Sequence, residues 1–103
     1  MDKKIVAIAK RYAQKAKAIV PASMVILYGS YAKGTAKAQS DIDIAVVLDK
    51  TPADYLKTSA SLFGLTIGLD ERIEPVLLIK GHDKSGFLES ILKHGKIIYK
   101  ARH

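Results

Sequence analysis

The chain has 103 residues, of which 49% are hydrophobic, so it is long enough for one domain with a core of modest size. The 17 Lys and Arg against 10 Asp and Glu give a net charge of +7, which favours a nucleotide, a nucleic acid or an acidic protein as partner. The absence of cysteine excludes disulfides and thiolate metal sites, and no apolar run approaches the roughly 20 residues of a membrane span. We therefore expect a single domain over residues 1–103, located in the cytoplasm and not in a membrane.

The first half of the chain predicts a helix and two strands. Apolar residues recur at three- and four-residue spacing over residues 3–20, which is typical of an amphipathic helix, and Pro21 ends it. The lysines between them are the ordinary solvated face of such a helix rather than a nucleic-acid surface. The apolar runs 24–28 and 42–48 predict strands, and residues 30–37 between them predict a short helix or turn.

The second half continues the alternation of helices and strands. Thr51 is a predicted N-cap, and the helix after it ends between Phe63 and Leu69. Its predicted inner face consists of Tyr55, Leu56, Ser59, Ala60 and Phe63. Residues 73–79 predict a strand, 84–94 a helix and 97–99 a last short strand. This order predicts an α/β domain with one small mixed sheet flanked by helices.

Two carboxylates open the second strand. Asp41 and Asp43 are two residues apart, so in a strand they project from the same face. Neighbouring carboxylates repel each other, and burying them unpaired is costly. A divalent cation relieves this repulsion, and Mg²⁺ takes oxygen ligands together with water and phosphate oxygens. The pair therefore indicates a magnesium site.

A Gly-Ser turn follows the first strand. Gly29 lets the backbone come close to a ligand, and the Ser30 hydroxyl adds a hydrogen-bond donor. Lys33 and Lys37 follow, and either lysine could reach a triphosphate, although solubilising charge is an equally good explanation. A phosphate cradle and a metal pair about ten residues apart suggest nucleotide chemistry.

These motifs resemble a known family. Gly29-Ser30-Tyr31-Ala32-Lys33-Gly34-Thr35 followed by Ser40-Asp41-Ile42-Asp43-Ile44 is similar to the signature of the polymerase beta-like nucleotidyltransferases, whose short form is the minimal nucleotidyltransferase. The resemblance implies the fold of that family, two Mg²⁺ ions on Asp41 and Asp43, and Gly29 and Ser30 on the β- and γ-phosphates.

The resemblance also implies a third carboxylate on the strand that follows the helix after Thr51. Glu74 is the best match, with Asp70 and Glu71 as rivals in the preceding loop. It is Glu where the family commonly has Asp, and Pro75 after it removes a backbone donor, which suits an edge strand or bulge. The three histidines have no metal-ligand spacing, and we expect them on the surface.

Minimal nucleotidyltransferases that resemble this chain are typically antitoxins paired with HEPN-domain ribonucleases. The resemblance implies transfer of AMP from ATP to a protein hydroxyl, a tyrosine of a HEPN toxin, within a hetero-oligomer. The alternative is a catalytically silent antitoxin that neutralises its partner by binding alone. Direct nucleic-acid binding is not expected, because the strand runs show no exposed aromatic platform.

Overall fold

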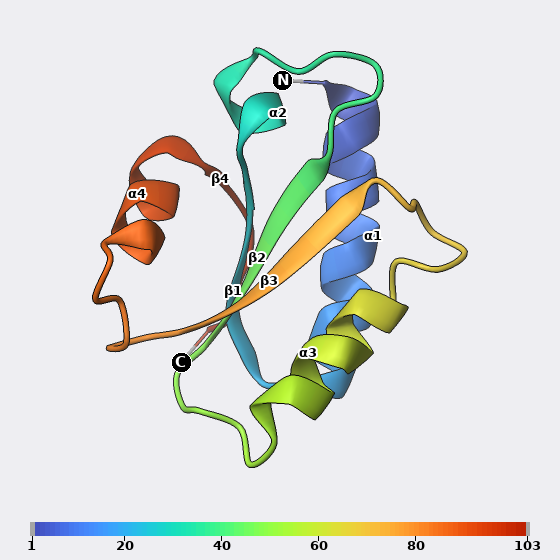
Figure 1. Ribbon diagram of the computed structural model, residues 1–103. Coiled ribbons are helices and arrows are strands. Elements are labelled where there is room, and N and C mark those ends of the chain that lie inside the picture. The colour runs from blue at the N-terminus through green and yellow to red at the C-terminus, as the bar shows by residue number, and fades with distance from the viewer. Residues whose placement is uncertain (1, 103) are drawn as a thin grey trace.

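The computed structural model describes residues 2–102, all but the first and last residues of the predicted domain 1–103. Four strands form one sheet with helices on both faces (Figure 1). The elements in chain order are α1 (Lys3–Ile19), β1 (Ala22–Tyr28), α2 (Ser30–Lys33), β2 (Ile42–Leu48), α3 (Tyr55–Gly64), β3 (Ile73–Ile79), α4 (Phe87–His94) and β4 (Lys96–Lys100). Among these elements no helix is long and apolar enough to cross a lipid bilayer.

The sheet is mixed, as the sequence predicts. Its strand order is β3-β2-β1-β4, with β1 antiparallel to both of its neighbours and β2 parallel to β3. A parallel pair needs a crossover connection, and α3 supplies it between β2 and β3. The end of β1 and the starts of β2 and β3 therefore meet at one end of the sheet, at the top in Figure 1.

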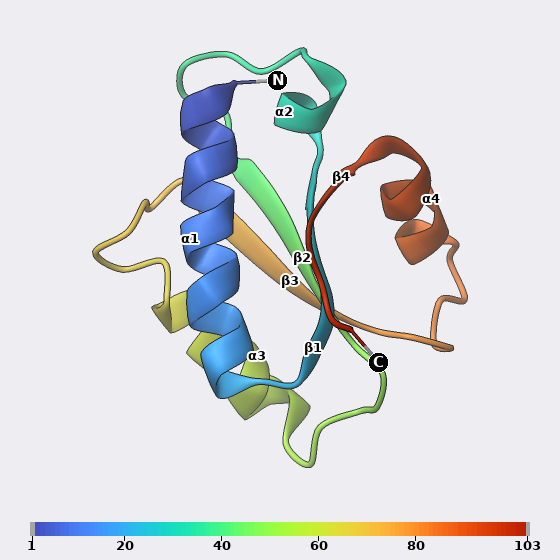
Figure 2. The ribbon, with the colours of Figure 1, turned by 180° about the vertical axis from the view of Figure 1, so that it is seen from behind.

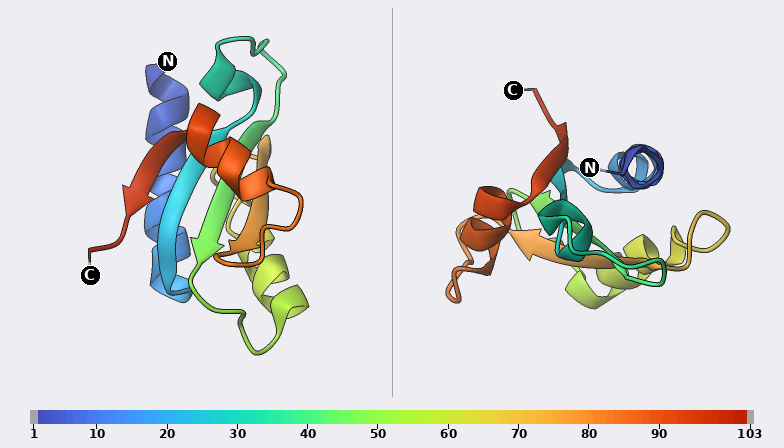
Figure 3. Two further views of the ribbon diagram at one scale, coloured as in Figure 1. Left: turned by 90° about the vertical axis from the view of Figure 1, so that its left-hand side faces the viewer. Right: turned by 90° about the horizontal axis from the view of Figure 1, so that it is seen from above.

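Helices cover the two faces of the sheet unequally. Figure 1 views the sheet nearly edge-on, with α1 and α3 on its right and α4 on its left, and Figure 3 gives the same arrangement from the side and from above. Side chains of β2 alternate between these faces. Ile42 and Ile44 pack into the larger core under α1 and α3, whereas Ala45 and Val47 pack into the smaller core under α4. Asp43 alternates with Ile42 and Ile44, so it lies on the α4 side.

The N-terminal helix closely follows its prediction. The Asp2 carboxylate caps it by accepting a hydrogen bond from the Lys4 amide at 2.8 Å, which satisfies one of the free donors of the first turn. The helix ends at Ile19, one residue before the predicted limit, and Val20 is its C-cap. Its buried positions are Ile5, Ala9, Tyr12, Ala13 and Ala16.

The predicted start and inner face of α3 are wrong. Its N-cap is Asp54 rather than Thr51, because the Asp54 carboxylate accepts the Lys57 amide at 3.0 Å. Leu62 is the buried side chain of this helix, while Leu56 is 80% exposed and Phe63 53% exposed. The helix covers the sheet near one end only, so its packing face is narrower than the apolar pattern suggests.

The last helix starts later than predicted and lies close to β1. It begins at Phe87 instead of Lys84, because the Asp83 carboxylate accepts the Leu88 and Glu89 amides at 2.8 and 2.9 Å. Gly95 follows the helix, and a Cβ atom there would stand 2.8 Å from the Leu27 carbonyl oxygen. Glycine therefore permits α4 to approach the C-terminal end of β1.

Candidate active site

Three polar side chains lie in a row across the end of the sheet at which β1 ends and β2 and β3 begin. In the strand register Tyr28 of β1 is opposite Asp43 of β2, and Asp43 is beside Glu74 of β3. Adjacent strands are about 4.8 Å apart, so these residues are immediate neighbours on the face that carries α4. Asp43 is half-buried and Glu74 is exposed.

The negative charges of Asp41 and Glu74 disfavour a charge on Asp43. The pKa of Asp43 is raised above its ordinary value, first by burial and then by the negative charges of Asp41 and Glu74. Burial, followed by the charges of Asp43 and Glu74, raises the pKa of Tyr28 to about 12. The site thus concentrates negative potential around a phenol that stays protonated at neutral pH.

Asp41 stands just before β2 and is exposed. Its effect on the pKa of Asp43 places it within electrostatic reach of that carboxylate. Among residues 2–102, no three acidic, histidine or cysteine side chains are gathered as a metal-binding group. The strand register places Asp43 beside Glu74, and the charge effect on the pKa of Asp43 relates Asp41 to this pair.

Gly29 links this row to the turn after β1. Its φ of 75° lies in the region that favours glycine, and a Cβ atom there would overlap Oδ2 of Asp43. Only glycine lets the turn pass so close to the carboxylate. The turn leads into α2, where the Lys33 amide donates to the Gly29 carbonyl oxygen at 3.0 Å. Ser30 and Lys33 are thereby held in the short helix that directly follows Gly29.

A cavity of ≈ 220 Å³ lies between this turn and α4. The rings of Tyr28 and Phe87 meet edge to face across it, with centroids 5.7 Å apart. His94 lies in its wall, with Nδ1 3.1 Å from the Ser90 carbonyl oxygen. His94 is exposed, as the sequence predicts, and it also lines this cavity. The signal that could have found this wall is the helical spacing of Phe87, Ser90, Ile91 and His94.

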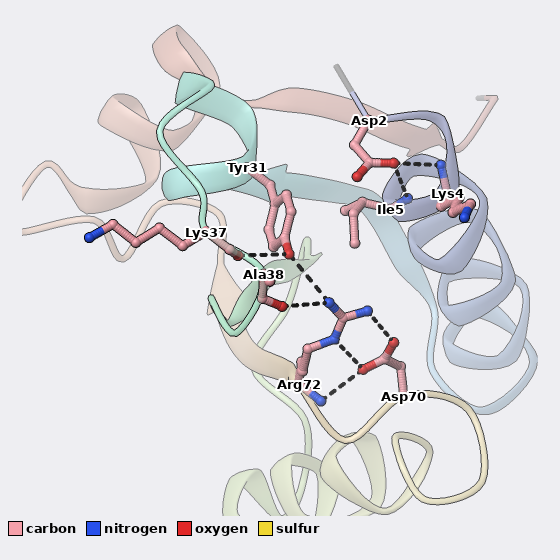
Figure 4. Close-up of polar contacts among 8 residues, drawn as sticks. All are labelled: Asp2, Lys4, Ile5, Tyr31, Lys37, Ala38, Asp70 and Arg72. Atoms are coloured by element: carbon pink, nitrogen blue, oxygen red, sulfur yellow. Dashed lines mark hydrogen bonds and ion pairs between the residues drawn. The ribbon is translucent and has the colours of Figure 1, made fainter.

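The rival third carboxylate Asp70 is already engaged. The Arg72 guanidinium donates from Nε and Nη2 to its two oxygens at 3.1 and 2.8 Å (Figure 4). This bidentate pair holds the pKa of Asp70 below its usual range. Arg72 Nη1 also donates to the Tyr31 hydroxyl and to the Ala38 carbonyl oxygen, each at 3.3 Å. Asp70 therefore orients an arginine that fixes the loop between α2 and β2.

The other rival, Glu71, is exposed and precedes β3. Neither loop carboxylate lies in the row of Tyr28, Asp43 and Glu74. The register thus favours Glu74 as the third carboxylate, and its role as a metal ligand stays a prediction.

Comparisons with known proteins identify the family. The model of the family described as "Polymerase beta, Nucleotidyltransferase" matches residues 3–103, so the chain belongs to this family. The predicted resemblance and fold class are both confirmed. Membership supports nucleotidyl transfer as the general activity. No curated protein matches the sequence.

Solved structures share the fold. A nucleotidyltransferase-like protein from Sulfolobus solfataricus is 19% identical with a TM-score of 0.69, covering 94% of this chain and 81% of its own. A toxin–antitoxin crystallised with AMP-PNP is 24% identical with a TM-score of 0.66, covering 90% of this chain and 74% of its own. A mutant of the toxin–antitoxin MntA–HpeT is 22% identical with a TM-score of 0.64, with the same coverage of 90% and 74%.

Proposed function

We propose that this protein is a Mg²⁺-dependent nucleotidyltransferase that moves AMP from ATP to a protein hydroxyl and acts as the antitoxin of a toxin–antitoxin pair. The observation that carries this proposal is the placement of Asp43 beside Glu74, directly against the glycine turn at Gly29. Carboxylates next to a glycine turn suit a metal-dependent reaction of a nucleoside triphosphate.

The carboxylates Asp41, Asp43 and Glu74 fit a divalent metal. Burial first, and then the negative charges of Asp41 and Glu74, raise the pKa of Asp43, and bound cations would remove the repulsion among these carboxylates. We assign two Mg²⁺ ions to these three residues. When bound, they would neutralise phosphate charge and lower the pKa of the acceptor hydroxyl.

The chain's own residues would hold the rest of the nucleotide. Gly29 lets the turn pass directly beside the Asp43 carboxylate. The Ser30 hydroxyl, next along the turn, would donate a hydrogen bond to a phosphate oxygen. Lys33 lines the adjacent cavity and would offset the charge of the triphosphate tail. The acceptor oxygen bonds to the α-phosphorus, the bond from that phosphorus to the bridging oxygen breaks, and pyrophosphate leaves. The hydroxyl proton passes to solvent.

A second protein would supply the acceptor. Toxin–antitoxin structures are among the similar folds, and one was crystallised with AMP-PNP. We infer that the acceptor is a tyrosine of a HEPN ribonuclease toxin in the cytoplasm. An added AMP brings a negative phosphodiester to the toxin, which would repel RNA.

The test is co-expression of the protein with its toxin, followed by intact-mass measurement of the toxin. The wild type should add one or more AMP units and restore growth, whereas Asp43→Asn should do neither. Unmodified toxin that both proteins neutralise equally would instead support the silent antitoxin that acts by binding.

A further inference from the structure

A second hollow lies outside the candidate active site. This groove of ≈ 400 Å³ runs between the N-terminal half of α1 and the start of β4, and its lining residues are Lys3, Val6, Ala7, Lys10 and Lys96. Figure 2 views the molecule from the side on which both elements can be followed. The nucleotide-binding turn and the carboxylate row contribute no residue to it. We call it the lysine groove.

The lysine groove carries uncompensated positive charge. Helix α1 contains six basic residues and no acidic one, so its lysines have no oppositely charged neighbour one turn away. The ion pairs found within residues 2–102 are Arg72–Asp70 and Lys80–Asp49, both remote from the groove. Lys3 also stands in the first turn of α1, where the helix dipole disfavours a cation. The cluster thus opposes local helix stability.

The floor of the groove is aliphatic. Val6 is half-buried and Ala7 is exposed between the lysines, and no aromatic ring lines the hollow. Farther along β4, the half-buried Tyr99 ring has the Lys17 ammonium 5.1 Å from its centroid. Single-stranded nucleic acids bind best where bases can stack on exposed rings. An apolar floor between cations instead fits a side chain that is apolar and flanked by carboxylates.

We propose that the lysine groove docks an acidic amphipathic helix of a protein partner. Lys3 and Lys10 are seven residues apart, which on a helix is about 10.5 Å along one face. Carboxylates seven residues apart on a partner helix repeat at the same distance. An apolar residue midway between them meets Val6 and Ala7, and Lys96 closes the groove from β4. This docking does not depend on nucleotidyl transfer.

The probe is a labelled helical peptide with glutamates at seven-residue spacing and leucines between them, titrated with the full chain by fluorescence anisotropy. Lys3→Gln/Lys10→Gln/Lys96→Gln should weaken binding about tenfold or more, because three partly desolvated ion pairs are lost. The matched control, Lys15→Gln/Lys50→Gln/Lys84→Gln, removes the same charge from exposed positions elsewhere and should change affinity less than about twofold. Asp43→Asn should bind like the wild type, which separates this test from that of the proposed reaction.

The peptide itself provides the second control. Replacing its leucines with serine keeps the charge, and affinity should fall because the apolar floor is no longer filled. Equal losses of peptide affinity in the two triple variants, or unchanged affinity for the serine peptide, would mean that the protein binds the peptide only by general charge attraction. Either result would overturn the proposal. Tighter, groove-dependent binding of a single-stranded RNA of equal charge would assign it to nucleic acid. Self-association that the groove variant alone abolishes would assign it to a second copy.

Discussion

At the scale of single residues, burial and then the negative charges of Asp41 and Glu74 raise the pKa of Asp43. Because its pKa is higher in the folded than in the unfolded chain, the folded state binds more protons as pH falls through this range. Stability therefore decreases as pH rises from the unfolded pKa through the folded one, and the loss persists at neutral pH. Replacing Asp43 with a neutral residue should relieve this loss of stability, and a bound cation should relieve it by pairing with the carboxylate.

The first prediction concerns metal and nucleotide binding. Mg²⁺ or Mn²⁺ should bind weakly alone and more tightly with ATP, since phosphate oxygens complete the coordination shell. Asp41→Asn/Asp43→Asn should weaken the ternary binding at least about tenfold in calorimetry, a loss of about 1.4 kcal/mol or more. The variant should be at least as stable as the wild type, so misfolding would not explain the loss. Equal affinity in both proteins would remove Asp41 and Asp43 from the metal site.

The second prediction concerns the third carboxylate. Glu74→Gln should lower transfer at least about 100-fold, because the neutral amide cannot replace a carboxylate ligand or its charge. The melting temperature should not fall, since the side chain is exposed at a strand edge. Glu71→Gln is the matched control and should keep its activity. An active Glu74→Gln protein would return the assignment to Asp70 or Glu71.

The candidate site residues that the sequence could predict are those defined by local spacing. Asp41 and Asp43 are two positions apart, and Gly29 ends a strand, so their shared position follows from strand periodicity and turn chemistry. His94 and Phe87 reach the same cavity only because α4 folds back across the sheet onto β1. That contact depends on packing between distant segments, which a local pattern does not contain.

At the scale of elements, Arg72 joins the start of β3 to the loop that carries Asp41. It binds Asp70 through a bidentate pair and reaches Tyr31 in α2 and Ala38 on the loop after α2 (Figure 4). Its carbonyl oxygen also accepts the Ile42 amide at 2.8 Å. The loop is therefore positioned by β3 rather than by its own sequence.

The third prediction is that Asp70→Asn destabilises the protein by about 1–2 kcal/mol, because a charged hydrogen-bonded partner of Arg72 is lost at a partly exposed site. The pKa of Asp70 is lowered in the fold, so its stabilising effect is present above the unfolded pKa of about 3.9 and disappears as pH falls below it. Thermal melts should show a gap between wild type and variant at pH 7 that narrows toward pH 3. A gap that does not depend on pH would show that the charge of Asp70 is not what stabilises the loop.

Element types were more predictable than their packing faces. The bounds of β2 and β3 follow directly from apolar runs, because both strands lie between covered faces of the sheet. The inner face of α3 could not be inferred in the same way. Its exposed Leu56 and Phe63 match the helical period as well as its buried Leu62 does, and only contact with α1 distinguishes them.

At the scale of the whole molecule, the α1 and α3 layer is joined by one buried hydrogen bond. Tyr12 is fully buried, and its hydroxyl donates to the Leu62 carbonyl oxygen at 2.7 Å. Burial raises the pKa of Tyr12, so the phenol remains a neutral donor. Both residues lie on the face of the sheet opposite Asp43. Stability and nucleotide binding should therefore respond separately to changes on the two faces.

The fourth prediction tests this separation. Tyr12→Phe keeps the ring but leaves the Leu62 carbonyl without its partner, so we expect a loss of about 1–3 kcal/mol, with roughly 4–8 °C of melting temperature for each kcal/mol. Tyr55→Phe is the matched control: it loses a 2.6 Å bond to the Leu77 carbonyl oxygen, but Tyr55 is 41% exposed and water can replace the donor. Its melting temperature should fall less. Calorimetry with ATP and Mg²⁺ below the melting range should give wild-type affinity for both variants. Equal melting losses would mean that burial does not set the cost, and weaker nucleotide binding in Tyr12→Phe would mean that the two faces of the sheet are coupled.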